Sequence, residues 1–525
     1  MNEINNTFLK FSKRSETLDV DYLVKTFVNV GPLFTILSNK EHEIVYGRRG
    51  TGKTHALLNL KNSINNANEI SVYIDLRTIG SNGGIFSDSS ISVVERATRL
   101  LIDTITFIVN NIVDTIISDE TGKYDLSRVS PIADKIWDSI NEIKIESEIE
   151  KTENTEENST DSTQKNRNFE ISNKGVNYGR EKKTGIGSSV KKLTESKIKG
   201  ISEHRIHFAS LFSNLKEFTQ KLKTDVWILI DEWAEVPQEL QPYLAELLRR
   251  TILPNPNFIL KIAAIEQRTN ISFSDVNSNR IGIEIGADIA TTQNLDEYMV
   301  FDNDEEKSKE FFKELIFHHF INTFPESTIR NADELISIGF SQINSFTEFV
   351  RSSEGIPRDA INILSIAASK ANDNKISIEN VRSAARTWYG RGKEKAITSN
   401  QAAHKLLLWI IDEVIGQRSA RAFLLQTNKK DKIIDYLFDS RVLHIIKENI
   451  SGKDKPGLRY NVYSIDYGCY VDLLNTKNAP KGLFAVIDDS EDDETEIYID
   501  VPKTDYRAIR RAILDLDEFY KQIIV

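Results

Sequence analysis

The chain has 525 residues, of which 40% are hydrophobic and 28% charged, and its net charge is -11. This composition is ordinary for a water-soluble globular protein, and the length predicts two to four domains. The single cysteine, Cys469, excludes disulfide frameworks and cysteine-rich zinc sites. The N-terminus lacks the apolar core of a secretory signal, and polar residues interrupt the most apolar stretch, residues 100–117. We therefore expect a cytoplasmic protein without a membrane span.

The first motif in the chain is GRRGTGKT at residues 47–54, between a short apolar segment, residues 43–46, and a helical one. Such a glycine loop points backbone N–H groups at an anion, and the dipole of the following helix adds favourable charge. The alternative, a glycine-rich turn that matches by chance, is disfavoured by the strand before it and the helix after it. The sequence therefore predicts an ATP phosphate site formed by Gly47, Arg48, Arg49, Gly50, Thr51, Gly52, Lys53, Thr54 and His55. Lys53 would reach the β- and γ-phosphates, and the Thr54 hydroxyl would hold Mg²⁺.

A second motif, DVWILIDEWAEVP at residues 225–237, is an apolar run that ends in two acids. A fully apolar run is typical of a central strand in a parallel sheet, and its carboxyl end is where ligands bind in such folds. We expect Asp231 to bind Mg²⁺ through water, and Glu232 to orient or deprotonate the attacking water. The alternative is a solvated acidic turn.

Other segments indicate how the chain is organised. Strands are predicted at residues 69–76, 257–268 and 280–289 and a helix at residues 93–117, an alternation typical of an α/β fold with a parallel sheet. Residues 305–390 have a helical pattern. In residues 401–475, helices precede an alternating stretch, which favours a winged helix. The last fifty residues contain an acidic run at 488–500, a predicted strand at 496–501 and a predicted helix at 505–520.

Residues 354–364, EGIPRDAINIL, resemble the lid motif of AAA+ ATPases of the initiator type, the origin-recognition and cell-division-control class. Residues 15–37, 42–57 and 282–289 resemble the bacterial branch of that class. The resemblance implies that Arg358 contacts the γ-phosphate in cis, with Gly355 and Pro357 at the start of its helix. It also implies a sensor residue at Glu266, where Asn, Thr or Ser is commoner. A trans-acting arginine is implied, with Arg280 as first choice and Arg268 as second, ahead of Arg249 and Arg250.

The predicted domains follow from these patterns and from the resemblance. They are an N-terminal linker segment at 1–40, a phosphate-loop AAA+ α/β core at 41–300, a helical lid at 301–395, a winged-helix-like domain at 396–475 and a C-terminal tail at 476–525. The core contains a mobile insertion at 142–200, because residues 142–168 are polar and poor in large apolar side chains. Within it, residues 174–199 carry eight Lys/Arg against two Glu, which suits either DNA phosphates or a solvated linker.

The function predicted from these observations is ATP binding and hydrolysis, coupled to DNA or to a DNA-bound partner. In relatives the winged helix contacts DNA, and lysines and arginines gather there at Lys429, Lys430, Lys432, Arg441, Lys453 and Lys455. The protein would act as a homo-oligomer or with a partner ATPase or effector. The main alternative is an ATP-gated switch that controls a partner effector, as in bacterial defence or mobile-element systems, without essential DNA binding. A small-molecule kinase is a third reading, which the lid disfavours. Zinc at His204 and His207 and calcium at 488–500 lack the ligand patterns that these ions need.

Overall fold

The computed structural model describes residues 2–12, 19–29, 31–79, 88, 90–119, 122–140, 143–147, 200–204, 207–274, 279–289, 291–299, 304–418, 420, 422–429, 431–451, 457–471 and 512–523. The chain divides into two units. The first contains Met1–Ile140 and Ile206–Val525, and the second is the intervening segment Asn141–Arg205.

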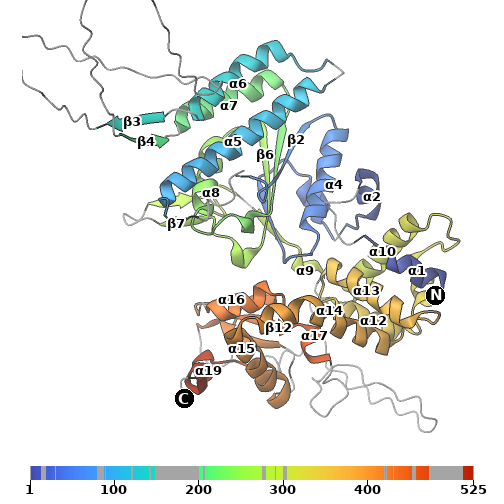
Figure 1. The fold of residues 1–525 in the computed structure, drawn as a ribbon. Helices are drawn as coiled ribbons and strands as arrows, with labels where there is room; N and C mark the ends of the chain where they lie inside the picture. The colour runs from blue at the N-terminus through green and yellow to red at the C-terminus, as the bar shows by residue number, and fades with distance from the viewer. Residues whose placement is uncertain are drawn as a thin grey trace, which may run out of the picture. The chain divides into compact units, whose positions relative to one another are not determined.

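A five-stranded parallel sheet forms the centre of the first unit (Figure 1). Its strand order is β2-β5-β6-β1-β9. The sequence favours this arrangement because every residue of β5 and β6 is buried, as expected of strands covered on both faces. The strands are β1 (Glu43–Tyr46), β2 (Ile70–Asp75), β5 (Val226–Asp231), β6 (Phe258–Ala264) and β9 (Thr291–Asn294).

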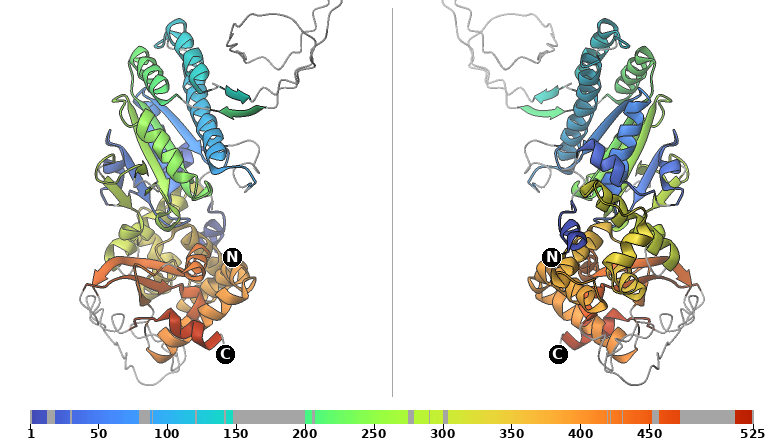
Figure 2. Two further views of the ribbon diagram at one scale, coloured as in Figure 1. Left: turned by 90° about the vertical axis from the view of Figure 1, so that its left-hand side faces the viewer. Right: turned by 90° about the vertical axis from the view of Figure 1, so that its right-hand side faces the viewer.

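Helices cover both faces of this sheet (Figure 2). One face packs against α4 (Lys53–Asn66), and the other against α5 (Val93–Ile117), α7 (Phe208–Leu222) and α8 (Gln241–Thr251). The helix α6 (Leu126–Ile140) packs against α5 and α7. By length and composition alone α5 could cross a membrane, but its buried side chains, from Ala97 to Ile116, belong to the cluster on the sheet. The α/β prediction for the core is therefore confirmed.

Two details of the predicted sheet were wrong. The segment 280–289 is not a strand of the main sheet, because only β8 (Arg280–Gly282) is extended and it pairs antiparallel with β7 (Ser272–Ser274). The fifth strand is β9, which the sequence pattern did not indicate. Its residues, TTQN, are all polar because β9 is an edge strand whose side chains are half-buried or exposed.

The N-terminal segment 1–40 is more than a linker, because it forms α1 (Glu3–Leu9), α2 (Val20–Thr26) and α3 (Leu33–Leu37). In α1, the Asn5 amide donates to the carbonyl of Asn372 at 2.8 Å. The helix α2 packs against α4 of the core and against α10 (Glu305–Thr323). The N-terminal segment therefore packs on both the core and the helical region that follows it.

Residues 305–398 form the predicted helical region. After α10 come α11 (Ala332–Gly339), α12 (Ile343–Ser352), α13 (Pro357–Ala371) and α14 (Ile378–Thr398). Pro357 is well placed at the first position of α13, where its missing N–H costs nothing. Because α14 continues to Thr398, it crosses the predicted boundary at residue 395.

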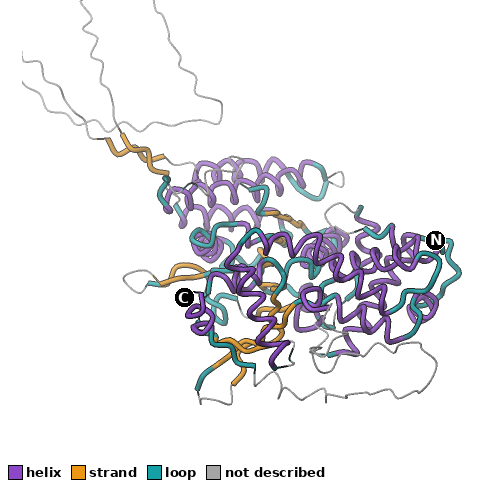
Figure 3. The backbone as a smooth tube through the Cα atoms, turned by 60° about the horizontal axis from the view of Figure 1, so that its bottom comes forward, coloured by secondary structure: helices purple, strands orange, loops and turns teal. Residues whose placement is uncertain are grey.

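The C-terminal region is mixed α/β (Figure 3). Helices lead into a β-hairpin, as predicted, but an additional strand, β10, completes an antiparallel sheet of order β10-β12-β11. Its elements are α15 (Gln401–Ile411), a π-helix (Asp412–Gln417), β10 (Ala422–Gln426), α16 (Lys432–Asp439), β11 (Leu443–Ser451), β12 (Arg459–Ile465) and α17 (Tyr467–Tyr470).

The described end of the chain packs on this C-terminal sheet. The Leu424 N–H of β10 donates to Ala512 O at 2.9 Å, and the Leu514 N–H donates back to Leu424 O at 3.1 Å. The helix α19 begins only at Leu516 and ends at Ile523, so the predicted helix at 505–520 was wrong for residues 512–515. The predicted strand at 496–501 lies outside the described residues.

The second unit contains a short antiparallel pair, β3 (Ile143–Ser147) and β4 (Gly200–His204). The insertion predicted at 142–200 therefore begins with a strand, while residues 148–199 lie outside the described part. His204 ends β4 and His207 precedes α7, so the two histidines do not share a helix face.

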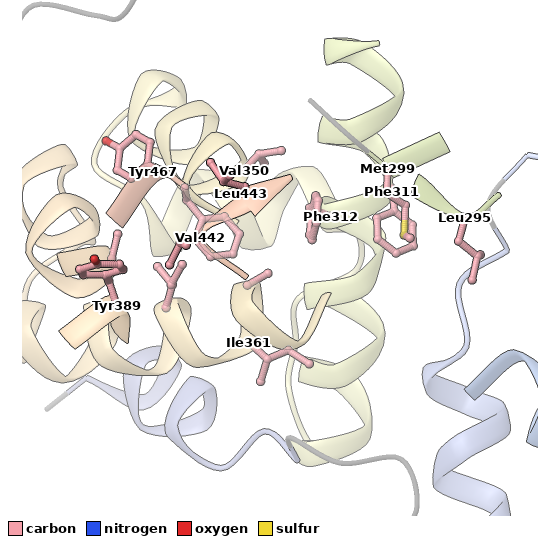
Figure 4. Close-up of a cluster of buried hydrophobic side chains, with 14 of the residues drawn as sticks. Leu295, Met299, Phe311, Phe312, Val350, Ile361, Tyr389, Val442, Leu443 and Tyr467 are labelled. Atoms are coloured by element: carbon pink, nitrogen blue, oxygen red, sulfur yellow. The ribbon is translucent and has the colours of Figure 1, made fainter. Parts of the chain in front are cut away.

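One apolar cluster runs through the helical and C-terminal regions (Figure 4). It joins Leu295 after β9 to Phe312 in α10, Val350 in α12, Leu443 in β11 and Tyr467 in α17. Because these side chains are at most 2% exposed, the C-terminal region shares its core with the helical region.

A buried ion pair lies inside the main sheet. Glu43 in β1 faces Lys261 in β6, with Oε2 and Nζ 3.1 Å apart and both side chains at most 1% exposed. We expect Lys261→Met to lower the free energy of unfolding by about 3–5 kcal/mol, because it leaves the Glu43 carboxylate buried without its partner. Urea denaturation would measure this loss. The double variant Glu43→Gln/Lys261→Met should recover most of it, and a double variant as unstable as the single one would contradict this account.

Candidate active site

The loop between β1 and α4 has the geometry of an anion cradle. Gly50 and Gly52 adopt positive φ angles of 91° and 94°, which place them in the region that favours glycine. Gly52 directly precedes α4, and the Ala56 N–H donates to its carbonyl at 2.9 Å. The first N–H groups of α4 therefore point into the curve of the loop, as a phosphate site requires.

Lys53 is folded over this loop. Its Nζ donates to the carbonyls of Gly47 at 2.7 Å and Arg48 at 3.0 Å. Burial lowers the pKa of Lys53, the carboxylates of Asp231, Asp296 and Glu232 oppose that effect, and Arg358 adds to it. The ammonium group therefore lies among the charged side chains of three other segments.

Asp231 is the last residue of β5 and is 1% exposed. Its Oδ2 accepts from the Tyr73 hydroxyl at 2.8 Å, and its Oδ1 accepts from the Glu232 N–H at 2.8 Å. Tyr73 is in β2, the neighbouring strand, and burial together with Asp231 raises its pKa. The carboxylate is thus held in one orientation at the carboxyl edge of the sheet.

Glu232 has an unusual backbone for a residue with a side chain, with φ 55° and ψ 42°. Left-handed residues of this kind cluster at functional sites. Burial and the neighbouring Asp231 raise the pKa of Glu232, while Lys53 and Arg77 lower it. The Arg77 Nη1 lies 3.8 Å from the Glu232 Oε1. A carboxylate with a raised pKa beside a phosphate loop has the properties of a general base.

Arg358 is the second residue of α13 and lies beside the loop. Its N–H donates to Gly50 O at 3.2 Å, and a Cβ added at Gly50 would lie 3.0 Å from the Cβ of Arg358. The predicted lid arginine therefore lies against the predicted phosphate loop, although 305 positions separate Lys53 from Arg358 in the sequence.

Three other predicted loop residues have side chains engaged elsewhere. Arg48 pairs with Asp296 at 2.9 Å, and Arg49 pairs with Glu235 at 2.7 Å. The His55 Nε2 lies 2.7 Å from the carbonyl of Leu23 in α2, and burial lowers its pKa. At His55, contact with a phosphate would come from the main-chain N–H rather than from the side chain. At Arg48 the main-chain N–H also donates to Asp296, at 3.0 Å. Thr51 Oγ1 donates to Arg48 O at 2.8 Å and fixes the turn of the loop.

The predicted sensor residue, Glu266, follows β6, and its Oε2 accepts from the Asn294 amide of β9 at 3.1 Å. A cavity of about 490 Å³ opens beside it and beside Gly47, between the sheet edge and β11. Polar residues on both sides line this cavity, among them Arg48, Asp296, Lys447 and Glu448.

The candidate trans-acting arginines differ in their surroundings. Arg280 on β8 has a side chain that is 50% exposed and pairs with Glu284 four residues on. Arg268 donates from Nε to Asp439 of α16 at 2.7 Å within the same chain. Arg249 and Arg250 both pair with Glu246. Arg280 therefore pairs within its own segment, whereas Arg268 pairs with the C-terminal region.

Some of the basic residues predicted to contact DNA already form ion pairs within the chain. Lys429 pairs with Asp515 at 3.3 Å and with Asp517 at 3.1 Å. Arg441 lies 3.5 Å from Asp359 of α13. Lys432 is exposed at the start of α16. The remaining lysines of the predicted set, Lys430, Lys453 and Lys455, lie outside the described residues.

Several side chains at the site were missed by sequence reasoning. Tyr73 and Asp296 orient residues that were predicted to form the site, but neither belongs to a phosphate-binding motif. Arg77, two residues after Asp75 at the end of β2, follows the same pattern of a polar residue at a strand end that identified Asp231. That pattern was the available signal for Arg77, whereas Asp296 follows the unrecognised strand β9.

A histidine beside the site predicts a pH dependence. His319 in α10 is 4% exposed, and its Nδ1 forms a hydrogen bond with the Tyr22 hydroxyl at 3.1 Å. Burial, together with nearby His55 and His318, lowers the pKa of His319 to about 3. The unfolded chain, with a histidine pKa near 6.5, therefore binds more protons below pH 6.5. We expect the wild type to lose about 1.4 kcal/mol more than His319→Gln between pH 7.5 and 5.5. Urea denaturation at both pH values tests this, and equal losses would contradict it.

The arrangement suits a magnesium–phosphate complex. Both Asp231 oxygens already accept hydrogen bonds, which fits an ion that keeps its own water molecules and is reached through them. Thr54, in the first turn of α4, carries a hydroxyl and directly follows Lys53. Among the described residues no group of three or more His, Cys, Asp or Glu could hold a metal alone, so a phosphate would have to supply further ligands. A phosphate loop, a helix N-terminus and a strand-end carboxylate together define a site of the phosphate-loop class.

No protein-family model matches this chain. No curated protein sequence matches it either. Among solved structures, the crystal structure of Cdc6p from Pyrobaculum aerophilum is similar at 11% identity, with 90% of this chain and 97% of that chain covered and a TM-score of 0.31. The structure of the Aeropyrum pernix Orc1 protein in complex with DNA is similar at 11% identity, with 89% and 95% covered and a TM-score of 0.28. Scores this low do not establish a shared fold.

Proposed function

We propose that this protein is an ATPase of the AAA+ class, initiator-like, which binds ATP with Mg²⁺ at the loop of residues 47–54 and hydrolyses the ATP. The observation that carries the proposal is that α13 meets the phosphate loop, because the Arg358 N–H donates to Gly50 O at 3.2 Å. Asp231 at the end of β5 and Glu232 directly after it act with Arg358 on the pKa of Lys53 in the same loop. A loop lysine, a pair of strand-end acids and a lid arginine are the parts that ATP hydrolysis needs.

Each residue has a distinct role in the proposed mechanism. Lys53 turns from the carbonyls of Gly47 and Arg48 to the β- and γ-phosphates, and Arg358 holds the γ-phosphate from the side of α13. Glu232 accepts the proton of the attacking water. Thr54 and Asp231 would hold Mg²⁺, which neutralises charge on the phosphates when bound. Arg280 of a neighbouring copy would complete the site, which makes a homo-oligomer or a partner ATPase part of the proposal.

The proposed domains follow the described elements. The core of residues 41–300 holds the phosphate site, and α10–α14 serve as the lid. The region from α15 to α17 serves as a winged-helix-like domain, supported by its helices and its β11–β12 hairpin. We propose a cytoplasmic location, as the composition predicts.

Lys53→Ala tests the ATP site directly. We expect ATP affinity to fall by about 10²–10⁴-fold, because two charge-assisted hydrogen bonds to phosphate are worth about 1.5–3 kcal/mol each. Titration with a fluorescent ATP analogue and Mg²⁺ would measure the affinity. Lys135→Ala is the matched control, since Lys135 makes an exposed pair with Glu217 at 3.6 Å on distant helices. Unchanged affinity and turnover in Lys53→Ala would refute the proposal.

We propose further that nucleotide state is coupled to double-stranded DNA, or to a partner bound to DNA, through the C-terminal domain. The resemblance to initiators supports this coupling. Lys432 at the start of α16 is exposed, and Arg459 at the start of β12 is also exposed. Contacts from such side chains to phosphates would give salt-dependent binding without sequence preference.

A second candidate is an ATP-gated switch that controls a partner effector, and one observation favours it. Lys429 and Arg441, two of the expected DNA contacts, are paired with carboxylates of this same chain. A chain of net charge -11 also offers no general attraction to nucleic acid.

ATP turnover with and without double-stranded DNA, across a salt series, separates the two candidates. Stimulation by DNA that disappears at high salt would support the initiator-like function. Turnover that does not respond to DNA at any salt concentration would favour the switch, and the effector would then be sought among partners bound in the ATP state.

A further inference from the structure

Arg48 lies in the phosphate loop, but its side chain points into the protein and is 6% exposed. Its Nε donates to Asp296 Oδ1 at 2.9 Å, and its main-chain N–H donates to Asp296 Oδ2 at 3.0 Å. Asp296 begins α9 (Asp296–Met299), directly after the edge strand β9. Both carboxylate oxygens therefore hold one residue of the loop, which fixes the start of the loop relative to the sheet.

A second contact of Arg48 reaches the helical region. Its Nη2 donates to the main-chain carbonyl of Glu354 at 2.8 Å. Glu354 and Gly355 have positive φ angles of 51° and 72° and form the turn that leads into α13 and Arg358. Because the Arg358 N–H also donates to Gly50 O, the loop and this turn are joined at two points. A displacement of the loop must therefore move the turn that carries the lid arginine.

The same turn contacts the C-terminal region. The Glu354 Oε1 accepts from the Tyr467 N–H at 3.1 Å, at the first residue of α17. The Tyr467 ring is fully buried in the cluster of Figure 4, and its hydroxyl donates to Glu348 of α12 at 2.5 Å. Two successive residue contacts, Arg48 to Glu354 and Glu354 to Tyr467, thus connect the phosphate loop to the C-terminal domain.

Two further observations agree with this connection. Burial is the largest cause, and the charge of Arg48 the second, that lowers the pKa of His444 in β11 to about 4. The charge of Arg48 therefore acts on a residue of the C-terminal domain. The Arg48 Nη1 is buried and has no hydrogen-bond partner among the described residues. A buried donor without an acceptor costs about 1–3 kcal/mol, so Arg48 keeps an unused donor beside its contacts to Asp296 and Glu354.

We propose that Arg48 is a positioning residue, which holds the phosphate loop against Asp296 and transmits the position of the loop through Glu354 to the start of α17. This inference rests on the proposed ATP site. An arginine suits the role because its planar guanidinium can bind a carboxylate with one edge and a carbonyl with another. A lysine carries its three donors on one nitrogen, so it cannot reproduce the spacing between the guanidinium Nε and Nη2 that bind the two partners.

Hydrogen exchange at the Tyr467 amide, with and without a non-hydrolysable ATP analogue, tests the transmission. In the wild type at saturating nucleotide we expect the exchange rate to change about 5-fold or more, the lower end of typical coupling between sites. Arg48→Ala should weaken nucleotide affinity and abolish this response even at saturation. Arg48→Lys should restore part of the affinity through Asp296 but not the response.

Variants of Glu354 separate transmission from a general structural effect. Glu354→Ala removes the acceptor of the Tyr467 N–H and should abolish the response, while Glu354→Gln retains an oxygen at that position and should preserve it. Arg128→Ala is the control for arginine removal, because Arg128 makes an exposed pair with Asp125 on α6 and its side chain is 69% exposed.

The outcomes are distinguishable. If the wild type binds no ATP analogue, the proposed function fails, and this inference fails with it. If the wild type binds nucleotide but Arg48→Ala and Glu354→Ala respond at Tyr467 as the wild type does, only the inference is wrong. If Arg48→Ala does not fold, Arg48→Lys and the two Glu354 variants decide the question.

Discussion

Glu232→Gln is expected to slow ATP hydrolysis by about 10²–10⁴-fold while leaving ATP bound, because removal of a general base has effects of that size. The glutamine keeps the shape of the side chain and cannot accept the proton of the attacking water. The left-handed backbone at Glu232 places the carboxylate just past β5, beside Asp231 and Lys53. Single-turnover hydrolysis and nucleotide titration, measured on the same preparation, separate the loss of chemistry from any loss of binding.

The pH dependence of the wild type gives an independent check. Because burial and Asp231 raise the pKa of Glu232, the fraction of deprotonated base should begin to fall at a higher pH than for an ordinary glutamate, near 4.3. The turnover of the wild type should fall with it as the pH decreases. Glu217→Gln, at an exposed residue of α7, is the matched control. Normal turnover in Glu232→Gln would assign the base elsewhere.

Two strands could be predicted from sequence because they are buried on both faces. In β5 and β6 every side chain is buried, so the pattern is a continuous apolar run with clear ends. The edge strand β9 has no such pattern, because an edge strand with half-exposed polar residues reads as a loop. The strand predicted at residues 280–289 is too long because its apolar residues alternate with polar ones without continuing the strand. After Gly282, Ile283 and Ile289 are buried and Ile285 is exposed.

The residues of the site also divide into those that a sequence motif predicts and those that no motif predicts. The loop and the acids at the end of β5 could be predicted because each depends on a local motif, and Arg358 because a known family carries the same motif. Asp296 and Glu354 could not be predicted, because their roles arise only when the ends of β9 and α12 meet the loop. The ion-pair partners of Arg268 and Arg441 could not be predicted either, because Asp439 and Asp359 are distant from them in sequence.

A buried charge cluster holds the helical and C-terminal regions together, next to Arg358. Lys393 of α14 lies 2.9 Å from Asp359 of α13 and 2.5 Å from Asp466, which caps α17, and each of these side chains is at most 4% exposed. His444 contacts the same Asp466 at 3.0 Å. The two carboxylates raise the pKa of Lys393, and Lys393 with His444 keeps the pKa of Asp466 well below its usual range. The ammonium group of Lys393 therefore balances two buried carboxylates from different regions of the chain, and Arg441 lies 3.5 Å from one of them, Asp359.

Lys393→Met should destabilise the protein by about 3–5 kcal/mol, because it leaves Asp359 and Asp466 buried without their shared counter-charge. The thermal midpoint measures this loss, and Lys395→Met, at an exposed position of the same helix, should change stability by less than about 0.5 kcal/mol. Adding Asp466→Asn to Lys393→Met removes one of the stranded charges and should recover part of the stability. If the double variant is no more stable than the single one, lost packing rather than charge explains the effect. Because Asp359 follows Arg358, recovery would also mean that the lid arginine is held in place by a charge balance that extends into the C-terminal domain.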